Sequence, residues 1–422
     1  MGVGGAGISA VAAFAKYAGF QISGCDIDQT SQFLNSLKKD NVELFTSHNP
    51  KHLEDIDLVV VSPAIESLDP NNLEISEARK RNIPVVIGEK FLEDHILKNK
   101  KVIAVSGTHG KSTTTAMIGK ILEDAAFDPS VLVGAVITDW GRNYRLGQSE
   151  YFVLEADEYQ EKFLLYSPYI SVITAVEMDH PEFFSSLSVV QEAFENFANK
   201  TNEYLVIGKK IELRIKNSEL TIRQFGRDFN TGNFNLKLIG NFNQENAALA
   251  FEVAKLLGVD EQTARTSLEA FRGVGRRFEF CGEEKGIKVF DDYAHHPTAI
   301  RLTAQAAREK FPTEKIWLVY QPHMFSRTKY LEKEFVETFK SLPVDQVILV
   351  DIFAARQENK ENISSKDIVE QVSKDSVRYI RDFEDTASYL IKNLHEGDIV
   401  INMGAGDIYK LSGILLEKLK TN

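Results

Sequence analysis

Residues 102–125 read VIAVSGTHGKSTTTAMIGKILEDA, and this stretch contains the strongest local signal in the chain. A short apolar run at 102–105 predicts a buried strand, and the run from 114 to 125 predicts a helix. The glycine-rich turn between them would direct backbone N–H groups and the positive end of the helix toward an anion. We therefore predict a phosphate-binding loop that consists of Gly107, Thr108, His109, Gly110, Lys111, Ser112 and Thr113.

Two side chains of this loop would carry its chemistry. Lys111 would add a full positive charge beside the phosphates, and the Ser112 hydroxyl would be placed to ligate Mg²⁺. The loop is shorter than the usual phosphate loop, because only Thr108 and His109 separate its two glycines. The alternative is a glycine turn capped by a hydroxyl side chain. It does not explain why strand, loop, Lys-Ser pair and helix occur in this order.

The same alternation of short apolar runs and longer helical patterns extends along the chain. Continuous apolar runs of strand length, separated by helical stretches, predict parallel strands that are covered on both faces. The fold class is therefore α/β. The other predicted strands are 58–61, 151–154, 170–173, 287–290, 316–320, 347–350 and 399–402.

The length of 422 residues suggests about three domains. Charged or glycine-rich stretches at 93–101 and 272–286 each precede a new strand, so we place boundaries there. The predicted domains are 1–97, 98–277 and 278–422, each built on a mainly parallel sheet. Residues 201–237 have a weak pattern that fits β-hairpins or an insertion.

Composition narrows the class of protein. Hydrophobic residues make up 43% and charged residues 26%, as in globular proteins. No apolar run reaches the ~18–20 residues of a membrane helix, and a glycine cluster, not a secretory signal, follows Met1. The net charge of −12 argues against a nucleic-acid-binding or membrane-surface protein, and the two cysteines argue against a disulfide framework. We expect a cytoplasmic enzyme.

Two acidic segments follow predicted strands. Glu155-Ala-Asp-Glu158 comes after strand 151–154, and Glu177-Met-Asp-His180 comes after strand 170–173. Because ligands bind beyond the carboxyl ends of strands in open α/β sheets, both segments could face a nucleotide on Lys111. Glu155 and Ser112 would suit one Mg²⁺, and His180 a second. A solvated loop is the alternative for the second segment.

The N-terminus contains a second glycine-rich fingerprint. Residues 2–7 read GVGGAG and lead into a predicted helix (8–18), and Asp26 follows at the distance expected of a dinucleotide-binding fold. Alone, this pattern would indicate a nicotinamide-dependent dehydrogenase. The fingerprint needs a preceding strand, however, and only Met1 comes before it. We expect either that the start site is assigned too late or that the first sheet lacks a strand.

The order of the motifs resembles the Mur ligases of peptidoglycan synthesis, over essentially the whole chain. Within that family the histidine in the phosphate loop, the DDYAHHP run and the QPHMFSRT run resemble the branch that adds L-alanine. The motifs that carry the resemblance are GTHGK (107–111), EADE (155–158), DH (179–180), GNFNQENAA (240–248), RRFE (276–279), DDYAHHP (291–297), QPHMFSRT (321–328) and GAGDI (404–408).

The resemblance implies an activity and one ligand for each domain. The N-terminal domain would bind UDP-N-acetylmuramate, the central domain ATP with Mg²⁺, and a C-terminal Rossmann-like domain L-alanine. ATP would phosphorylate the lactyl carboxylate, and the alanine amine would attack the resulting acyl phosphate. The reaction would be an ADP-forming amide ligation, in which the protein mainly positions groups and neutralises charge.

The resemblance also assigns roles to individual residues. Lys111 would hold the β- and γ-phosphates, and Ser112, Glu155 and His180 would hold Mg²⁺. The adenine would contact Asn243 and Asn246, although Asn243 could instead cap a helix. Arg277 would reach the ATP phosphates, and Asp292 would contact the ribose or order the domain. The amino acid would contact Arg327 and either His295 or His296, with His296 placed among the catalytic residues. The UDP-sugar would contact Gly4, Gly5, Ala6, Gly7, Asp26 and Ser62.

Three positions depart from the family pattern. Ala175 and Phe242 stand where the family usually has Asn and His, and Met324 stands where the L-alanine branch usually has Arg. Arg327 would then hold the amino-acid carboxylate alone, so glycine or L-serine are alternatives to L-alanine. A ligase that recycles murein tripeptide is the alternative within the family. A dehydrogenase or a phosphate-loop motor or switch protein would leave several of the motifs unexplained.

Overall fold

The computed structural model describes residues 1–355 and 357–421, and its internal contacts divide the chain into two compact units. Unit 1 consists of Met1–Val176, Gln191–Asn235 and Glu245–Arg272, and unit 2 of Glu177–Val190, Leu236–Gln244 and Gly273–Asn422. Parallel strands dominate both units, which confirms the predicted α/β class. Among the described residues no helix is long and apolar enough to span a membrane.

The N-terminal part of unit 1 contains two separate pairs of parallel strands. One pair is β1 (Ser23–Cys25) with β2 (Glu43–Phe45), and the other is β3 (Val59–Val61) with β4 (Val85–Ile87). The Met1 amine donates to the Val60 carbonyl (2.6 Å), and the Gly2 N–H donates to the Cys25 carbonyl (2.8 Å). Residues 1 and 2 therefore lie between the two pairs. In the described part of the chain no strand precedes the first helix.

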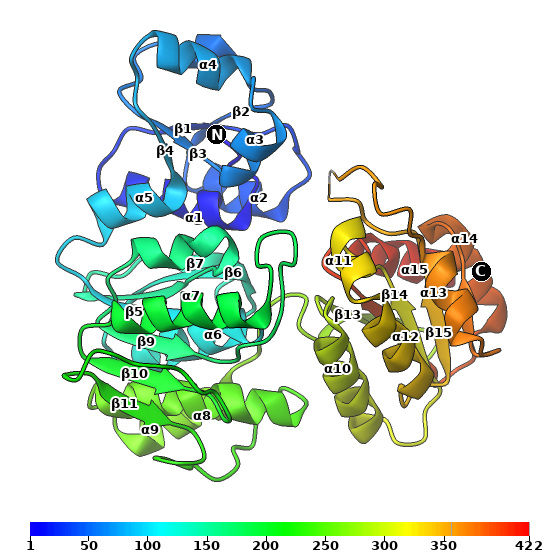
Figure 1. Cartoon of the computed structure of the whole chain (residues 1–422). Helices are drawn as coiled ribbons and strands as arrows, with labels where there is room; N and C mark the ends of the chain where they lie inside the picture. Colours follow the sequence, from blue (N-terminus) through cyan, green and yellow to red (C-terminus); the bar gives the residue numbers. More distant parts are fainter. Residues whose placement is uncertain (356, 422) are drawn as a thin grey trace. The chain divides into compact units, whose positions relative to one another are not determined.

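The helix that follows the glycine cluster, α1 (Ala6–Tyr17), begins two residues earlier than predicted. It buries one face, on which Phe14 packs its ring 4.8 Å from that of Phe152 in the central sheet. The other helices of this part are α2 (Gln32–Lys39), η1 (Pro50–Leu53), α3 (Pro63–Leu68), α4 (Leu73–Lys80), α5 (Gly88–Phe91) and η2 (Leu92–Ile96) (Figure 1).

The central sheet of unit 1 has seven strands in the order β11-β10-β9-β5-β8-β6-β7, and only β7 runs antiparallel to its neighbour. Segment 201–237 contributes β10 and β11, which extend the sheet in parallel and do not form a β-hairpin. The strands are β5 (Lys101–Ser106), β6 (Ser130–Ile137), β7 (Arg142–Arg145), β8 (Tyr151–Glu155), β9 (Ile170–Ile173), β10 (Tyr204–Ile207) and β11 (Thr221–Gln224).

Strand β5 lies between β9 and β8, and its apolar residues 102–105 are buried. The phosphate-loop segment, the EADE segment and Thr174–Ala175 follow these three neighbouring strands, so their carboxyl ends meet at one edge of the sheet. The helices along this part of the chain are α6 (Lys111–Asp124), η3 (Tyr159–Leu165), α7 (Leu187–Asn199), α8 (Asn241–Leu256) and α9 (Glu261–Ala270).

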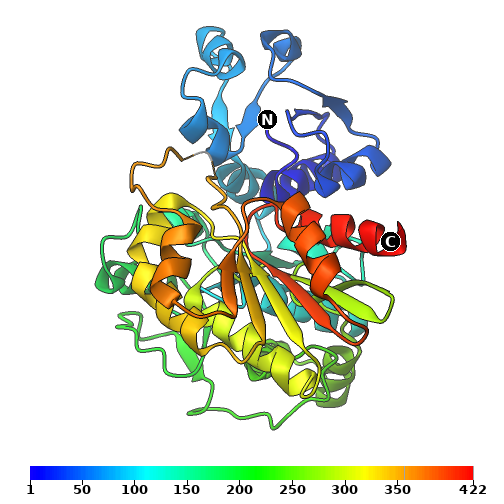
Figure 2. The same cartoon turned by 90° about the vertical axis from the view of Figure 1, so that its right-hand side faces the viewer.

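The sheet of unit 2 has six strands in the order β12-β13-β17-β14-β15-β16, with only β12 antiparallel (Figure 2). The strands are β12 (Glu279–Glu284), β13 (Ile287–Asp292), β14 (Ile316–Tyr320), β15 (Gln346–Leu349), β16 (Val377–Tyr379) and β17 (Ile399–Met403). The helices are α10 (Pro297–Lys310), α11 (Phe325–Tyr330), α12 (Glu332–Ser341), α13 (Ser365–Val372), α14 (Phe383–Asn393) and α15 (Tyr409–Thr421).

Side chains of β14 alternate between two hydrophobic cores. Leu318 packs in a core with residues of α10, α12 and α13, and Trp317 and Val319 pack in a second core with residues of α14 and α15. This alternation follows from the period of two along a strand. The sheet is thus covered by helices on both faces, as its continuous apolar strands predict.

We expect Leu318→Ala to lower the free energy of unfolding of the C-terminal sheet by about 3 kcal/mol, because it leaves a cavity in a fully buried core. Urea unfolding followed by Trp317 fluorescence measures this, in a Trp140→Phe background because Trp140 lies in unit 1. The control is Leu302→Ala on α10, where the side chain is 41% exposed and the change should stay within about 0.5 kcal/mol. Equal losses in both variants would contradict the two-faced core.

Candidate active site

The phosphate-loop segment turns sharply between β5 and α6. Gly107 has φ +135°, and a Cβ there would lie 2.8 Å from the Ala175 nitrogen, so no side chain fits. Gly110 has φ +84° in the left-handed region and precedes α6 as its N-cap. The Thr108 N–H donates to the Ala175 carbonyl (2.9 Å), and the Thr174 hydroxyl donates to the His109 carbonyl. The loop is therefore held against the end of β9.

Lys111 is the first residue of α6, and its ammonium group is fixed by two acceptors. It donates to the Gly107 carbonyl (2.6 Å) and to the carboxylate of Glu158 (2.9 Å), whose side chain is buried. Burial opposes the charge, but the carboxylates of Glu158, Asp157 and Glu155 raise the pKa of Lys111 above its ordinary value. Lys111 is therefore a permanent cation at the opening of the loop.

Ser112 and Glu155 come together as the sequence predicts. The Ser112 hydroxyl donates to one carboxylate oxygen of Glu155 (3.0 Å), and the Gly134 N–H donates to the other (2.7 Å). Two hard oxygen donors next to the phosphate loop suit Mg²⁺. His180, the third predicted ligand, lies in unit 2, where its Nδ1 contacts a carboxylate oxygen of Glu182 at 3.1 Å.

The two predicted adenine contacts differ in their surroundings. Asn246 is buried in α8, and its Oδ1 is the atom that a Cβ on Gly110 would meet, so its amide lies against the phosphate loop. Asn243 lies in the first turn of α8 and donates from Nδ2 to the Ile239 carbonyl (2.8 Å). Asn246 belongs to unit 1 and Asn243 to unit 2.

Arg327 forms a buried ion pair in unit 2. Its Nε and Nη2 both lie 3.0 Å from Oδ1 of Asp179, and the two residues are only 2% and 6% exposed. Burial alone would raise the pKa of the Asp179 carboxyl, but Arg327, His180 and His295 hold it well below its usual range. Asp179 thus neutralises the guanidinium that the sequence assigns to the amino-acid carboxylate.

His323 contacts the remaining terminal nitrogen of the same guanidinium, Nη1 of Arg327, at 3.1 Å from its Nδ1. Arginine only donates hydrogen bonds, so His323 Nδ1 must accept, and the proton of the neutral ring is on Nε2. Burial, together with the charge of Arg327, lowers the pKa of His323 to about 4. The ring also stacks on Phe353 at 5.6 Å.

The structure distinguishes the two adjacent histidines of the DDYAHHP run. His295 lies 3.9 Å from Asp179 and its ring is 6.2 Å from that of His323, so it belongs to the cluster around Arg327. Burial and the nearby Arg327 charge keep the pKa of His295 well below its ordinary value. His296, which the sequence places among the catalytic residues, caps α10 by accepting from the Thr298 N–H (3.3 Å).

Arg277 and Asp292 lie near one another in unit 2. The guanidinium of Arg277 lies over the Tyr293 ring at 5.0 Å. Both carboxylate oxygens of Asp292 accept backbone N–H groups, from Phe278 and Ala294 at 2.8 Å each. Of the two roles predicted for Asp292, these contacts support ordering of the domain.

The predicted UDP-sugar residues meet at the start of α1. The Gly4 N–H donates to the carboxylate of Asp26 (2.7 Å), and a Cβ on Gly4 would lie 2.8 Å from that carboxylate. Ser62 is the N-cap residue of α3, and its N–H donates to the Met1 carbonyl (3.1 Å). Gly5 is the N-cap residue of α1 and its N–H donates to the Gly2 carbonyl (3.0 Å). Ala6 and Gly7 lie in the first turn of α1, where backbone N–H groups can bind an anion.

Three residues have no individual role assigned from the sequence but hold site residues in the structure. They are Glu158, which holds Lys111, and Asp179 and His323, which hold Arg327. Each lies inside a motif that the sequence displays. The partners of Glu158 and Asp179 are distant in the chain, whereas His323 lies in the same motif as Arg327. Only the buried pairing reveals their role.

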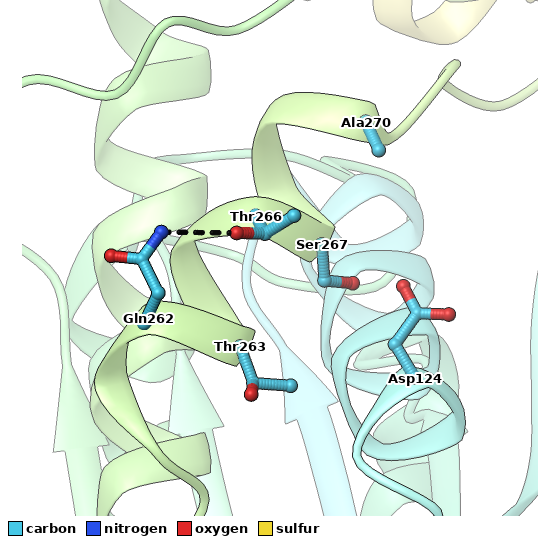
Figure 3. A pocket seen from close by; sticks show the side chains of 6 residues that line it. All are labelled: Asp124, Gln262, Thr263, Thr266, Ser267 and Ala270. Atoms are coloured by element: carbon cyan, nitrogen blue, oxygen red, sulfur yellow. Dashed lines mark hydrogen bonds between the residues drawn. The ribbon is translucent and has the colours of Figure 1, made fainter.

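A hollow of about 300 Å³ lies between α6 and α9. Figure 3 shows the side chains that line it. Gln262 donates a hydrogen bond to Thr266, and the side chains of Ser267 and Asp124 also border the hollow. Asp124 is the last residue of α6, whereas the phosphate loop is at the start of this 14-residue helix. The hollow is therefore separate from the nucleotide residues.

Family models match three consecutive parts of the chain. The model described as the Mur ligase family, catalytic domain, matches residues 1–100, the Mur ligase middle domain matches 105–228, and the Mur ligase glutamate ligase domain matches 276–406. Together these matches cover most of the sequence.

Curated relatives match over the full length. The UDP-N-acetylmuramate–L-alanine ligase of Caldanaerobacter subterraneus subsp. tengcongensis is 36% identical over 453 residues, which cover 100% of this chain and 97% of that protein. The protein of the same name from Alkaliphilus metalliredigens is 34% identical over 454 residues, covering 99% and 96%.

Solved structures match as well. The UDP-N-acetylmuramate-alanine ligase of Thermotoga maritima has a TM-score of 0.82 at 28% identity, covering 100% of this chain and 98% of that one. A murein peptide ligase of Psychrobacter arcticus has a TM-score of 0.73 at 22% identity, with the same coverage. The second likeness concerns the fold alone.

We expect Asp179→Asn to lower the free energy of unfolding by about 3–5 kcal/mol, because it leaves the Arg327 charge buried without its counterion. Urea unfolding of full-length protein measures the loss. The matched control is Glu337→Gln, which removes an exposed pair with Lys340 and should cost at most about 1 kcal/mol. A loss no larger than the control's would show that the pair is not buried as described.

We expect the His323 ring to remain neutral as the pH falls through 6 and to titrate near pH 4, because burial and Arg327 disfavour its cation. The unfolded chain binds this proton at about pH 6.5, so His323 makes the fold more stable above that pH and this contribution is lost toward pH 4. Histidine ring NMR shifts measure the titration. A midpoint near 6.5 would contradict the buried contact with Arg327.

Proposed function

This chain belongs to the Mur ligase family, and we propose that it joins L-alanine to UDP-N-acetylmuramate in the ATP-dependent, ADP-forming amide ligation of peptidoglycan synthesis. The observation that carries this proposal is the match over the full chain to ligases of that name. The phosphate loop with Lys111 accounts for the use of ATP. A dehydrogenase would leave that loop without a role.

The residues beside the loop fit Mg²⁺. Ser112 and Glu155 offer hydroxyl and carboxylate oxygens 3.0 Å apart, and hard oxygen ligands are what this ion prefers. We assign Ser112 and Glu155 to one ion and His180 to a second. A bound Mg²⁺ supplies charge that reduces the repulsion between a carboxylate and the phosphates.

The chain's own residues position the phosphoryl donor. In our proposal Lys111 turns from Glu158 to the β- and γ-phosphates, and the N–H groups of the loop and of the α6 N-terminus bind phosphate oxygens. A lactyl carboxylate oxygen attacks the γ-phosphorus, the bond to ADP breaks, and an acyl phosphate forms. The alanine amine then attacks the acyl carbon, loses a proton and expels phosphate. Such catalysis is mainly positioning and charge stabilisation.

The cluster around Arg327 supports an amino-acid site in unit 2. Asp179 engages Nε and Nη2, and His323 engages Nη1, so the guanidinium is fixed in one orientation. We assign Arg327 and His295 to the amino-acid carboxylate, and leave His296 as the cap of α10. Arg277 is assigned to the ATP phosphates, Asn243 and Asn246 to the adenine, and the Gly4–Gly7 turn with Asp26 and Ser62 to the UDP-sugar.

We include the domain boundaries and the cellular compartment of the protein in the same proposal. The first two family matches end at 100 and begin at 105, near the proposed boundary at 97, and the third begins at 276, near the proposed boundary at 277, which supports three domains. Cys25 and Cys281 are both free, Cys25 buried and Cys281 exposed, which supports a reducing cytoplasm.

Purified protein with ATP, Mg²⁺ and UDP-N-acetylmuramate should release phosphate when single amino acids are added, with L-alanine ahead of glycine and L-serine. The expected order follows from the L-alanine name shared by the relatives. Stimulation by murein tripeptide alone would instead favour the recycling ligase. Without any stimulation by an amino acid or peptide, the ligase proposal fails.

We expect Lys111→Ala to reduce phosphate release by about 100- to 1000-fold, because the variant loses a fixed cation at the transferring phosphate. The control is Lys120→Ala on the same helix, where the lysine pairs with Glu123 and Asp124 and should be dispensable. Retained turnover in Lys111→Ala would contradict the assignment of the phosphate loop.

A further inference from the structure

A buried cluster of metal-binding side chains lies in the N-terminal part of unit 1, apart from the residues assigned above. Cys25 ends β1, His48 lies before η1, His52 lies within η1, and Glu74 lies in the first turn of α4. One atom each of Cys25, His52 and Glu74 lies within 4.8 Å of the others. Cys25 and Glu74 are 3% exposed, and the side chains packed around Cys25 are apolar. The buried Met1 amine is the nearby positive charge, and it interacts electrostatically with both residues.

The separations within the cluster match those between ligands of one ion. The Cys25 sulfur lies 3.6 Å from a carboxylate oxygen of Glu74, and His52 Nδ1 lies 3.5 Å from the other. Tetrahedral zinc with bonds of about 2.0–2.3 Å holds its ligand atoms about 3.3–3.6 Å apart. Little movement is therefore needed to bring the three atoms around one ion.

His48 is placed to complete the set. Its Nδ1 lies 3.2 Å from the Cys25 sulfur and 3.9 Å from a carboxylate oxygen of Glu74. His52 Nδ1 is buried and has no hydrogen-bond partner, although the ring stacks on Phe45 at 4.0 Å. A buried nitrogen with an unused lone pair or proton is costly, and a metal ion would relieve that cost.

We propose that Cys25, His52 and Glu74, with His48 as the fourth ligand, form a structural zinc site. One sulfur and two imidazole nitrogens favour Zn²⁺ over Mg²⁺ or Ca²⁺, and four protein ligands leave no open position for catalysis. Binding converts the Cys25 thiol to a thiolate on the ion and releases one proton to solvent.

The position of the site suggests what the ion stabilises. Cys25 directly precedes Asp26, whose carboxylate accepts from the Gly4 N–H. The Asn49 N–H donates to Glu74 (2.9 Å), which ties the loop of the two histidines to α4. The ion would therefore join β1, this loop and α4 beside the Gly4–Gly7 turn. Metal binding itself does not depend on the proposed ligase activity.

Cobalt is the probe that reads the ligands directly. Full-length protein, stripped with a chelator and titrated with Co²⁺ alone, should bind about one ion per chain with visible ligand-field bands and a near-ultraviolet sulfur-to-cobalt band. The sulfur band separates this site from the proposed Mg²⁺ residues, which include no sulfur. Zn²⁺ added to the cobalt-loaded protein should displace the cobalt and abolish both sets of bands. Zn²⁺ added to the stripped protein should raise its Tm.

Variants test each ligand against a matched residue. Cys25→Ser should lose the sulfur band, and His52→Gln and Glu74→Gln should weaken binding by at least about 10- to 100-fold. Cys281→Ser and His95→Gln change an exposed cysteine and an exposed histidine and should bind as the unaltered protein does. Circular dichroism of the stripped variants confirms folding.

Three outcomes would overturn the proposal. They are the lack of a sulfur band in the unaltered protein, a sulfur band that persists in Cys25→Ser, and a Tm that Zn²⁺ does not raise. Any of these would identify the cluster as a hydrogen-bonded network in which Cys25 donates to Glu74.

Discussion

The close approach of the phosphate loop to the end of β9 is the constraint on which the rest of the site depends. Gly107 leaves no room for a Cβ beside the Ala175 nitrogen, and the Thr108 N–H donates to the Ala175 carbonyl. Since β5 lies between β9 and β8, a loop fixed on one side presents Lys111 to the carboxylates that follow β8 on the other. The turn at Gly107 and Gly110 and the strand order β9-β5-β8 thus determine where the Lys111 ammonium group lies.

Much of this could be predicted from the sequence because its signals are local. The strand, loop and helix around Lys111 occur in the order that a phosphate site needs, and the α/β class follows from continuous apolar runs. The pairing of Ser112 with Glu155 was also predictable, because carboxyl ends of neighbouring parallel strands meet at one edge.

What could not be predicted depends on contacts between distant residues. Asp179 and Arg327 are 148 positions apart, and a sequence pattern does not pair them. His295 and His296 have the same chemistry, and only the start of α10 separates their roles. The parallel pairing of β10 and β11 was also missed, because their short runs, one of them half-exposed, show neither alternation nor full burial. The Cys25 cluster could not be predicted either, because its residues come from three segments that only the fold brings together.

The fate of the lactyl carboxylate oxygen shows whether the reaction passes through an acyl phosphate. UDP-N-acetylmuramate carrying heavy oxygen in that carboxylate would be turned over with ATP and L-alanine, and the released phosphate analysed by mass spectrometry. The account predicts that each phosphate carries one labelled oxygen, because this oxygen attacks the γ-phosphorus and leaves with it. Phosphate without label, formed together with the amide product, would contradict the acyl-phosphate route.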